Sequence, residues 1–511
     1  MTLFSALSPD LPGAELLQPE DTWIHTASVV GEYGITASVR TFDEVLDWQE
    51  KRRALTQGYY RLIHPPRVQR FKARLEQKYP GYTAVLFSSG KLAAREWGDL
   101  VELKQITGKT VQLKKLPEAL DCGACVLHLS NKEGIEAGVV LLKTARDAAE
   151  LHERNRRRGG ALSVRNVDVL MGDSPEPPLE GSEKEEASDI LRRLASADEV
   201  LFYPSGMAAV TAALEQVLTP ETPGIAVLGN VYRDTHLLLE EMPWAQTAVE
   251  PHLLDTGDLP ELQRVLKDPK VGAVFFETIT NPLIELPDLP EIVKLAHRAG
   301  KTVIVDSTMA SPLNCRPLEW GVDLVVHSTS KYLSGSNQHG GGIVLTRSAE
   351  RAKRLRKAQT RDGNELSPLE FPALLAGLRT FPERMPRFNR NGQALAELLR
   401  NHPAVDTVYF GGESLPEWLT GLGSVVSCEL KDRSQEALAR VFNADMPGVI
   451  KAPSLGSDHT LFCPYVFLTY YDKSDEYLEA CHLPRHLLRF AVGCEEDLDP
   501  VLHAVKKALE A

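Results

Sequence analysis

The chain has 511 residues, of which 43% are hydrophobic and 25% charged, a balance typical of a soluble globular protein with two or three domains. The formal net charge of −13 disfavours a nucleic-acid partner, and no apolar run of about 18 residues predicts a transmembrane helix. The odd number of cysteines, seven, and a start without the basic and apolar regions of a signal peptide, favour a cytoplasmic protein with reduced thiols.

Residues 1–160 are predicted to form a separate α/β extension of unknown role, with charged helices near residues 41–53 and 68–79. This region shows no catalytic constellation. Its basic run from Arg154 to Arg158 precedes Gly159-Gly160. A phosphate or RNA patch is one interpretation, but a charge run of this kind more often solvates the end of a helix, and that is the structure expected here.

The next segment, residues 173–186, is acidic and proline-rich and is expected to be a mobile linker. Short apolar runs then alternate with helical patterns. Their continuous apolar character indicates strands buried on both faces, hence a mostly parallel sheet covered by helices, whose ligands bind beyond the carboxyl ends of the strands. The runs are 199–202, 224–228, 273–276, 302–305, 324–326 and 342–345. A long helical region from about 370 leads to a smaller α+β unit that ends in a helix over 499–510.

Two segments have the pattern of a strand that turns into a helix at a glycine. Ser205-Gly206-Met207 follows the first apolar run, and Ser88-Ser89-Gly90-Lys91 is a similar segment upstream. Backbone N–H groups at such a helix start bind phosphate. We favour Ser205-Gly206-Met207, because the other candidate site segments follow it within one run of strands.

Lys331, in His327-Ser328-Thr329-Ser330-Lys331, follows a strand that ends in Asp306. A lysine among small hydroxyl residues, with an acid at the end of an earlier strand, is what pyridoxal phosphate chemistry requires: the lysine forms a Schiff base, and the carboxylate keeps the pyridine nitrogen protonated. No clustered histidine spacing predicts a metal site.

Further candidates follow other strands. Tyr232 is placed to stack on the pyridine and to act as acid or base, although a packing role is equally compatible with its position. Glu277 and Asn281 lie at another strand end, where Asn281 is able to bond the cofactor's phenolic oxygen. Arg489 lies in an apolar strand, and a substrate α-carboxylate suits its fork.

Together these segments resemble the Cys/Met-metabolism family of pyridoxal-phosphate enzymes, in particular its fungal-type cystathionine γ-synthase branch. The resemblance runs from about Ser163 and includes Ala452-Pro453-Ser454-Leu455-Gly456. It implies an aspartate-aminotransferase-like fold (fold type I), with a cofactor-binding large domain over 161–375 and a C-terminal small domain over 376–511. It also implies a homodimer or homotetramer with shared active sites.

The resemblance assigns a role to each residue. Lys331 is the Schiff-base lysine and Asp306 the pyridinium partner, Tyr232 stacks on the ring, and Ser454 with Arg489 receives the substrate carboxylate. Arg165 matches the arginine that reaches the phosphate of the neighbouring subunit. The phosphate is surrounded by Ser205, Gly206, Met207, Ser328 and Ser330.

Four departures from the family pattern concern the substrate more than the cofactor. Ser163 stands where many relatives have tyrosine, which removes a phosphate contact and a bulky wall of the entrance. Ser307 replaces asparagine, Ser330 replaces threonine, and Ser336-Asn337-Gln338-His339 differs from the usual His-Ser-Asp run.

We therefore expect γ-replacement on an O-acyl-L-homoserine through a vinylglycine-type ketimine. With cysteine as nucleophile the product is cystathionine; the sequence does not identify the nucleophile and leaves γ-elimination open as a side activity. The competing hypothesis within the family is a specialised substitution by a carbon or nitrogen nucleophile, giving a non-protein amino acid. A non-catalytic protein, whose extension mediates protein contacts, is the alternative from another class.

Overall fold

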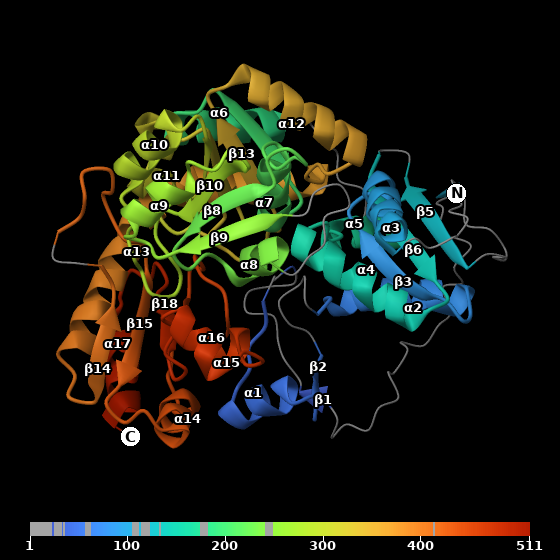
Figure 1. The fold of residues 1–511 in the computed structure, drawn as a ribbon. Coiled ribbons are helices and arrows are strands. Elements are labelled where there is room, and N and C mark those ends of the chain that lie inside the picture. The colour runs from blue at the N-terminus through green and yellow to red at the C-terminus, as the bar shows by residue number, and fades with distance from the viewer. Residues whose placement is uncertain are drawn as a thin grey trace.

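A seven-stranded sheet lies at the centre of the chain in the computed structural model, which describes residues 23–24, 33, 36–56, 63–104, 112–113, 123–131, 134–173, 182–240, 249–411 and 414–510 (Figure 1). The strand order is β7-β13-β12-β11-β10-β8-β9, and only β13 runs antiparallel to its neighbours. The strands are β7 (Glu199–Tyr203), β8 (Gly224–Leu228), β9 (Glu250–Leu254), β10 (Val271–Glu277), β11 (Thr302–Asp306), β12 (Leu324–Ser328) and β13 (Gly342–Thr346).

Both faces of this sheet are buried, which explains the continuous apolar strands. Val303 and Val305 face one hydrophobic cluster and Ile304 faces another. The first cluster is covered by α6 (Ser182–Ala195), α10 (Leu289–Arg298) and α13 (Phe371–Arg400), and the second by α7 (Gly206–Glu215), α8 (Arg233–Glu240) and α12 (Ala349–Asp362). The short helices α9 (Leu259–Val265) and α11 (Ser311–Asn314) and the 3-10 turns Pro317–Trp320 and Pro368–Glu370 complete this part. The predicted mostly parallel α/β fold is confirmed.

The sequence did not predict β9. This strand lies at the sheet edge, and none of its residues is fully buried. It carries Glu250, Pro251 and His252 among its five residues, so it lacks the apolar run that marks the other strands.

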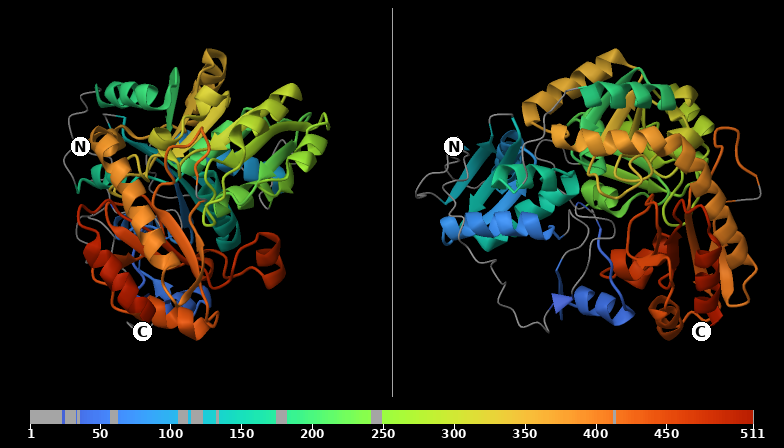
Figure 2. Two further views of the ribbon diagram at one scale, coloured as in Figure 1. Left: turned by 90° about the vertical axis from the view of Figure 1, so that its left-hand side faces the viewer. Right: turned by 180° about the vertical axis from the view of Figure 1, so that it is seen from behind.

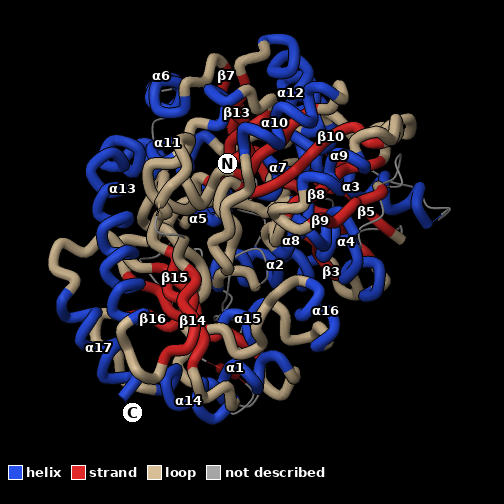
Figure 3. The backbone as a smooth tube through the Cα atoms, turned by 60° about the vertical axis from the view of Figure 1, so that its left-hand side comes forward, coloured by secondary structure: helices blue, strands red, loops and turns tan. Residues whose placement is uncertain are grey.

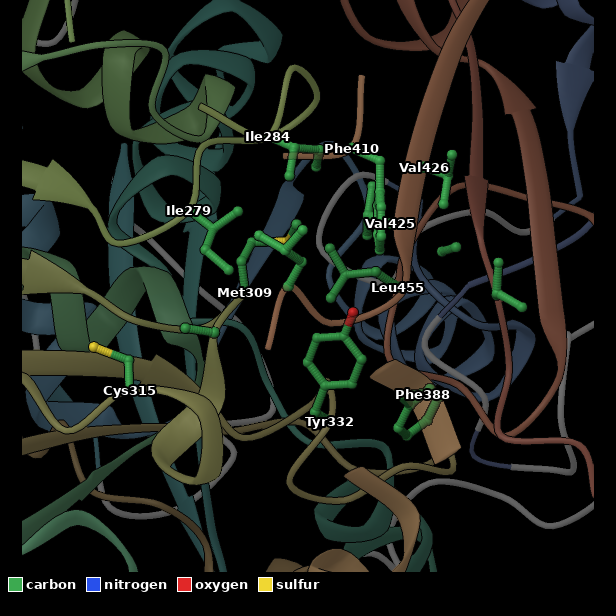
Figure 4. Packing of buried hydrophobic residues seen from close by; sticks show 14 of the residues in the cluster. Ile279, Ile284, Met309, Cys315, Tyr332, Phe388, Phe410, Val425, Val426 and Leu455 are labelled. Carbon is green, nitrogen blue, oxygen red and sulfur yellow. The ribbon is translucent and has the colours of Figure 1, made fainter. Parts of the chain in front are cut away.

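A second sheet, of order β14-β15-β18-β17-β16, forms the C-terminal part. Figure 3 shows its strands beside α13, α14 and α17. Its core merges with the first cluster of the large sheet, and Figure 4 shows Tyr332, Met309 and Leu455 packed there with Val425. The elements are β14 (Val405–Tyr409), β15 (Val425–Leu430), α14 (Gln435–Asn443), β16 (Val449–Lys451), β17 (Thr460–Pro464), α15 (Tyr465–Thr469), α16 (Asp475–Ala480), β18 (Leu488–Ala491) and α17 (Asp499–Glu510).

The N-terminal region divides into two parts. A four-stranded sheet of order β3-β6-β5-β4 has its own apolar clusters. By contrast, α1 (Phe42–Gln49) packs on α14 and α15, and Figures 1 and 2 show it beside the C-terminal elements. The remaining elements are β1 (Trp23–Ile24), β2 (Ala54–Leu55), α2 (Pro66–Lys78), β3 (Thr83–Phe87), α3 (Gly90–Lys104), β4 (Gln112–Leu113), β5 (Ala124–Ser130), β6 (Glu136–Leu142), α4 (Ala145–Arg158) and α5 (Val164–Met171).

The basic run at the end of α4 corrects the sequence interpretation. Arg154, Arg156 and Arg158 are buried rather than solvated. They form ion pairs with acids distant in sequence: Arg154 and Arg158 with Glu96, Arg158 also with Glu215, and Arg156 with Asp234. Burial of a charge requires such partners, and a local sequence pattern does not reveal them. The helix does end where predicted, at Gly159 in a left-handed conformation.

The predicted linker over residues 173–186 is shorter than expected, because α6 begins at Ser182; residues 174–181 lie outside the described part. The division into units at about residues 160 and 375 remains our proposal. Among the described residues, no helix combines the length and the apolar character needed to cross a membrane.

Candidate active site

A cavity of about 200 Å³ lies at the carboxyl ends of β10, β11 and β12 and is closed by the C-terminal sheet. The end residues of these three strands, Glu277, Asp306 and Ser328, all line it. This is the position at which parallel sheets bind ligands. Of the residues predicted to form the site, all except Arg165 line this cavity: Ser205, Gly206, Met207, Tyr232, Glu277, Asn281, Asp306, Ser328, Ser330, Lys331, Ser454 and Arg489.

Lys331 and Ser454 meet in this cavity although they are 123 positions apart. Lys331 Nζ donates to Ser454 Oγ at 2.7 Å, and Ser454 Oγ donates to Asn337 Oδ1 at 3.0 Å. Ser454 has a φ of +113°, a backbone conformation that is strained for a residue with a side chain. Strain of this kind persists where the surroundings hold the residue in place, and here it aims the hydroxyl at the lysine.

Arg489, on β18, presents a guanidinium held by neutral groups. Its two terminal nitrogens donate to Asn281 Oδ1 at 3.1 Å and to the Ser454 carbonyl at 2.6 Å, and the Tyr465 ring lies 4.8 Å away. Arg489 Nε is buried without a hydrogen-bond partner among the described residues. A buried donor of this kind is costly unless a ligand satisfies it, and a carboxylate would bind it in bidentate fashion.

Asp306, at the end of β11, accepts a hydrogen bond from Thr308 N at 2.9 Å, while Thr308 Oγ1 accepts one from Ser328 N at 2.8 Å. Burial raises the pKa of Asp306, and the hydrogen bonds from Thr308 oppose this only in part. The buried carboxylate therefore gains from a cationic partner, and a protonated pyridine nitrogen is such a group.

Glu277 ends the neighbouring strand β10, and its carboxyl accepts a hydrogen bond from Tyr232 N at 2.6 Å. Burial, together with the charge of Asp306, raises the pKa of Glu277 well above its usual range. The carboxyl group holds the backbone at Tyr232 and so places the tyrosine on the cavity wall.

The start of α7 also lines the cavity. Ser205 caps the helix by accepting from Ala208 N at 3.1 Å, which leaves the first N–H groups of α7 at the cavity. A Cβ on Gly206 would lie 2.9 Å from the Cβ of Ser328, so glycine permits the close approach of helix and strand. Ser330 is held by the backbone of Gly341 through two hydrogen bonds.

Sequence reasoning missed the contribution of the N-terminal region. Thr36 Oγ1 donates to the carbonyl of Pro453, and Val39 N donates to that of Lys451, which lays this segment beside Ser454. No local signal pointed to it, because its residues are ordinary apolar side chains. The cavity-lining residues of the extension are Ala37, Val39, Trp48, Leu55, Ile63 and Arg156.

Arg165 lies in a second cavity, of about 520 Å³, between the extension and the large sheet. It donates to Glu370 at 2.8 Å and to the carbonyl of Gln338 at 2.9 Å, and its guanidinium lies 4.3 Å from the Tyr33 ring centroid. Ser163 donates to the same Glu370 at 2.7 Å. The predicted contact of Arg165 with a neighbouring subunit stays a prediction.

The site fits pyridoxal phosphate: a lysine at the cavity, a buried carboxylate in need of a cation, a helix start, and an orphaned arginine donor. The chain has the fold of the pyridoxal-phosphate enzymes of fold type I. A family model described as Cys/Met metabolism PLP-dependent enzyme matches residues 184–510, and the chain belongs to this family. Arg165 and the extension lie outside the matched residues.

Three relatives illustrate the likeness. A cystathionine gamma-lyase of Bacillus subtilis is 29% identical over 328 residues, which cover 63% of this chain and 84% of the relative. A cystathionine gamma-synthase of Haemophilus influenzae is 30% identical over 308 residues, covering 60% and 79%. The crystal structure of cystathionine gamma synthase from Xanthomonas oryzae pv. oryzae in complex with cystathionine superposes with a TM-score of 0.58 at 29% identity, covering 63% and 84%. The chain is thus a pyridoxal-phosphate-dependent enzyme of Cys/Met metabolism.

Proposed function

We propose that the protein catalyses γ-replacement on an O-acyl-L-homoserine, with cysteine as the first candidate nucleophile and cystathionine as product. The observation that carries this proposal is the hydrogen-bonded chain from Lys331 through Ser454 to Arg489 and Asn281 in one cavity with Asp306. It places a base beside a carboxylate-binding fork, as a reaction at the α-carbon of an amino acid requires. Similarity to cystathionine gamma-synthases supports the γ-position.

Each residue has a defined task. The fork of Arg489 binds the α-carboxylate, and Asn281 with the Ser454 carbonyl keeps the fork oriented. Asp306 holds a proton on the cofactor's ring nitrogen, and bound pyridoxal phosphate stabilises negative charge at the substrate carbon.

Lys331 Nζ removes the proton from the substrate α-carbon. Ser454 Oγ, which accepts a hydrogen bond from Nζ at 2.7 Å, keeps the amine directed at this carbon. Tyr232 is placed on the cavity wall to assist proton transfer. Transfer of a Cβ proton, for which Tyr232 is the candidate acceptor, and departure of the γ-acyloxy group as a carboxylate open Cγ to the nucleophile. Protons returned to Cβ and Cα then complete the replacement.

One observation favours the second candidate, a substitution by a carbon or nitrogen nucleophile. The N-terminal segment contributes Val39, Trp48, Leu55 and Ile63 to the cavity wall, and Leu468 joins them from the C-terminal part. Apolar walls favour a nucleophile with an apolar body over cysteine, which brings an additional ammonium and carboxylate. The side chains that line the cavity determine which nucleophile binds, while the cofactor supplies the reactivity at the substrate carbon.

The test is incubation with O-acetyl-L-homoserine, alone and with cysteine, sulfide, a small β-keto acid or a secondary amine, followed by acetate assay and mass analysis of products. We expect slow acetate release without a nucleophile and faster release with the physiological one. Cystathionine as the main product supports the first candidate; preference for the keto acid or amine supports the second. No acetate release under any condition would refute γ-replacement. The Lys331→Ala protein is the matched control.

We also propose a cytoplasmic homodimer or homotetramer. Its basis is the family resemblance of Arg165 to an arginine shared between subunits, together with the odd number of cysteines, seven, which does not form a complete disulfide framework. Size-exclusion chromatography with light scattering checks the assembly.

A further inference from the structure

The turn between β8 and α8 carries Arg233, which directly follows Tyr232 and is the first residue of α8. Both residues line the active-site cavity. Two hydrogen bonds fix the turn: Tyr232 N donates to Glu277 at 2.6 Å, and Asn230 Nδ2 donates to the carbonyl of Cys481 at 2.6 Å. The place of Arg233 at the cavity is therefore set by contacts with the large sheet and with the C-terminal part.

The guanidinium of Arg233 has one carboxylate partner within the described part of the chain. Its Nη2 donates to Asp472 Oδ1 at 2.9 Å. The side chain of Asp472 is 65% exposed, whereas that of Arg233 is 22% exposed. Because water screens an ion pair with so exposed a carboxylate, Asp472 balances the charge of Arg233 only weakly.

The same guanidinium has donors left for a ligand. Arg233 Nε is buried and has no hydrogen-bond partner among the described residues. The hydrogen bond to Asp472 is the one that the side chain makes within those residues. A buried donor without a partner costs free energy until a ligand satisfies it, and a carboxylate is the group that a guanidinium binds most strongly.

A pair of buried tyrosines links Arg233 to Arg489. The Arg489 guanidinium lies 4.8 Å from the Tyr465 ring centroid, and the Arg233 guanidinium lies 5.6 Å from that of Tyr470. The two ring centroids are 6.1 Å apart. Each arginine thus contacts a different ring. The two guanidiniums are separate groups of one cavity, and each can bind its own carboxylate.

The other cations that line the cavity are already committed. Arg156 is held by two carboxylates of its own chain. In the proposed function Arg489 binds the α-carboxylate of the substrate, and Lys331 acts at the α-carbon. Arg233 is the cation that this function has not used.

We propose that Arg233 binds a second carboxylate in the active site, distinct from the α-carboxylate at Arg489. The inference rests on the proposed function and narrows it, because one of the two reactants then carries a carboxylate beyond the amino-acid group that reacts. The carboxylate comes from one of two sources, the nucleophile or a dicarboxylic acyl group on homoserine. An acidic nucleophile with an apolar body would also suit Val39 and Trp48 on the wall of the same cavity.

The test compares nucleophiles that differ in the carboxylate. The parent holoenzyme and Arg233→Gln are given O-acetyl-L-homoserine with matched pairs: cysteine and cysteamine, acetoacetate and its methyl ester, proline and pyrrolidine. For the pair that the parent enzyme uses, we expect kcat/KM with the acid to fall about 10- to 100-fold in Arg233→Gln, because a charge-assisted hydrogen bond is lost. With the partner that lacks the carboxylate, kcat/KM should stay within about 3-fold.

A second arm locates the carboxylate. O-Succinyl-L-homoserine replaces the acetyl ester, with sulfide as nucleophile in both cases. A fall confined to the acidic nucleophiles supports the proposal and identifies the nucleophile as the source; a fall confined to the succinyl ester supports it and identifies the acyl group. Equal falls for every substrate, or no fall for any, overturn the proposal.

Asp472→Asn is the matched control, because it removes the same ion pair but keeps the arginine. If Arg233 binds a carboxylate, Asp472→Asn should use the carboxylate-bearing reactant at least as well as the parent enzyme. If Arg233 only joins the turn to the C-terminal part, both variants should lose activity alike, with and without the carboxylate, and the proposal is refuted.

The absorbance of the bound cofactor shows whether Arg233→Gln retains its fold. If it does not, Arg233→Lys decides, because lysine keeps the charge but not the fork. A fall of more than about 3-fold in the ratio of kcat/KM with the carboxylate to kcat/KM without it supports the role of Arg233. An unchanged ratio refutes it.

Failure of this inference and failure of the proposed function give different results. No release of the acyl group by the parent enzyme refutes γ-replacement itself. Normal release by the parent enzyme, with a ratio that substitution of Arg233 leaves unchanged, refutes only the role of Arg233.

Discussion

Two strand–turn–helix units in this protein share a local structure but differ in what surrounds them. In β7–α7, Ser205 caps the helix by accepting from Ala208 N; in β3–α3, Ser89 does so by accepting from Leu92 N. Each opens onto a cavity, the first containing Lys331 and the second containing Arg165. The local sequences are similar enough that either could be taken for a phosphate-binding turn.

The difference lies in how the charges around each cavity are balanced. Arg165 pairs with Glu370, which also contacts His339, so the charge of Arg165 in the second cavity is balanced by a carboxylate of the same chain. Within the described part of the chain, no carboxylate lies within ion-pair distance of Arg489, whose bonds go to Asn281 and Ser454. We infer that a helix start serves as a binding site when a nearby charged side chain has no partner of opposite charge in the protein, because a bound ligand then supplies that partner.

The largest expected effect is on turnover, and it distinguishes Lys331 in the first cavity from Lys91 in the second. Lys331→Ala should lower turnover at least about 10³-fold, because it removes the base and the point of cofactor attachment. Lys91→Ala, which loses only a hydrogen bond to the Thr360 carbonyl, should change kcat/KM by less than about 2-fold. Borohydride followed by peptide mapping should locate the cofactor on Lys331. Labelling elsewhere would contradict the assignment.

Hybrid subunits sharpen the question of Arg165. If Arg165 reaches a neighbour's phosphate, mixing inactive Arg165→Ala and inactive Lys331→Ala proteins should restore about a quarter of the activity, since half of the dimers are hybrids with one intact site. Verified subunit exchange without recovery would leave Arg165 as a partner of Glu370 within its own chain.

The two turn glycines provide a direct comparison. In Gly206→Ala the new Cβ would press on Ser328 at the cavity, so we expect cofactor affinity to fall about 10-fold. In Gly90→Ala it would lie 2.4 Å from Cγ of His128, so we expect unfolding free energy to fall by about 1–3 kcal/mol with cofactor affinity unchanged. Cofactor titration and urea denaturation measure the two effects. Weaker cofactor binding in Gly90→Ala would contradict this prediction, because it would indicate that the β3–α3 unit contacts the cofactor.

The smallest effect concerns pH and Glu370. Burial raises the pKa of Glu370, but Arg165, His339 and Ser163 outweigh this effect and lower the pKa to about 2. The pKa of Glu370 in the folded protein thus lies below its value of about 4.3 in the unfolded chain. The ionised carboxylate therefore contributes fully to the free energy of unfolding above about pH 4.3, and this contribution is lost as the pH falls toward about 2. Glu370→Gln should destabilise the protein by about 1–3 kcal/mol at pH 7, and by progressively less below about pH 5.

Urea midpoints across this pH range test the expectation. The control is Glu350→Gln, whose side chain is 80% exposed and pairs with Arg354 on the surface, and which should change little. A difference between Glu370→Gln and the parent protein that persists unchanged at low pH would contradict the role of the ionised carboxylate.

Much of the central fold was predictable, because strands buried on both faces leave continuous apolar runs, as at residues 302–305 and 342–345. The presence of Asp306 and Lys331 in one cavity followed from their place at or just after strand ends. Arg156 was misinterpreted because its carboxylate partner Asp234 lies 78 positions away. The role of Val39 and Trp48 was invisible for the same reason, since their contacts are with the far end of the chain.

The contact between Thr36 and Pro453 spans 417 positions and has a consequence for synthesis. During translation the segment around Val39 and Trp48 emerges before the central sheet, and the surface that receives it is made after that sheet. These apolar side chains must wait, exposed, while the central sheet folds, and the cavity cannot close before β18 is made. We therefore expect this apolar segment to stay exposed on the nascent chain until the C-terminal sheet is made.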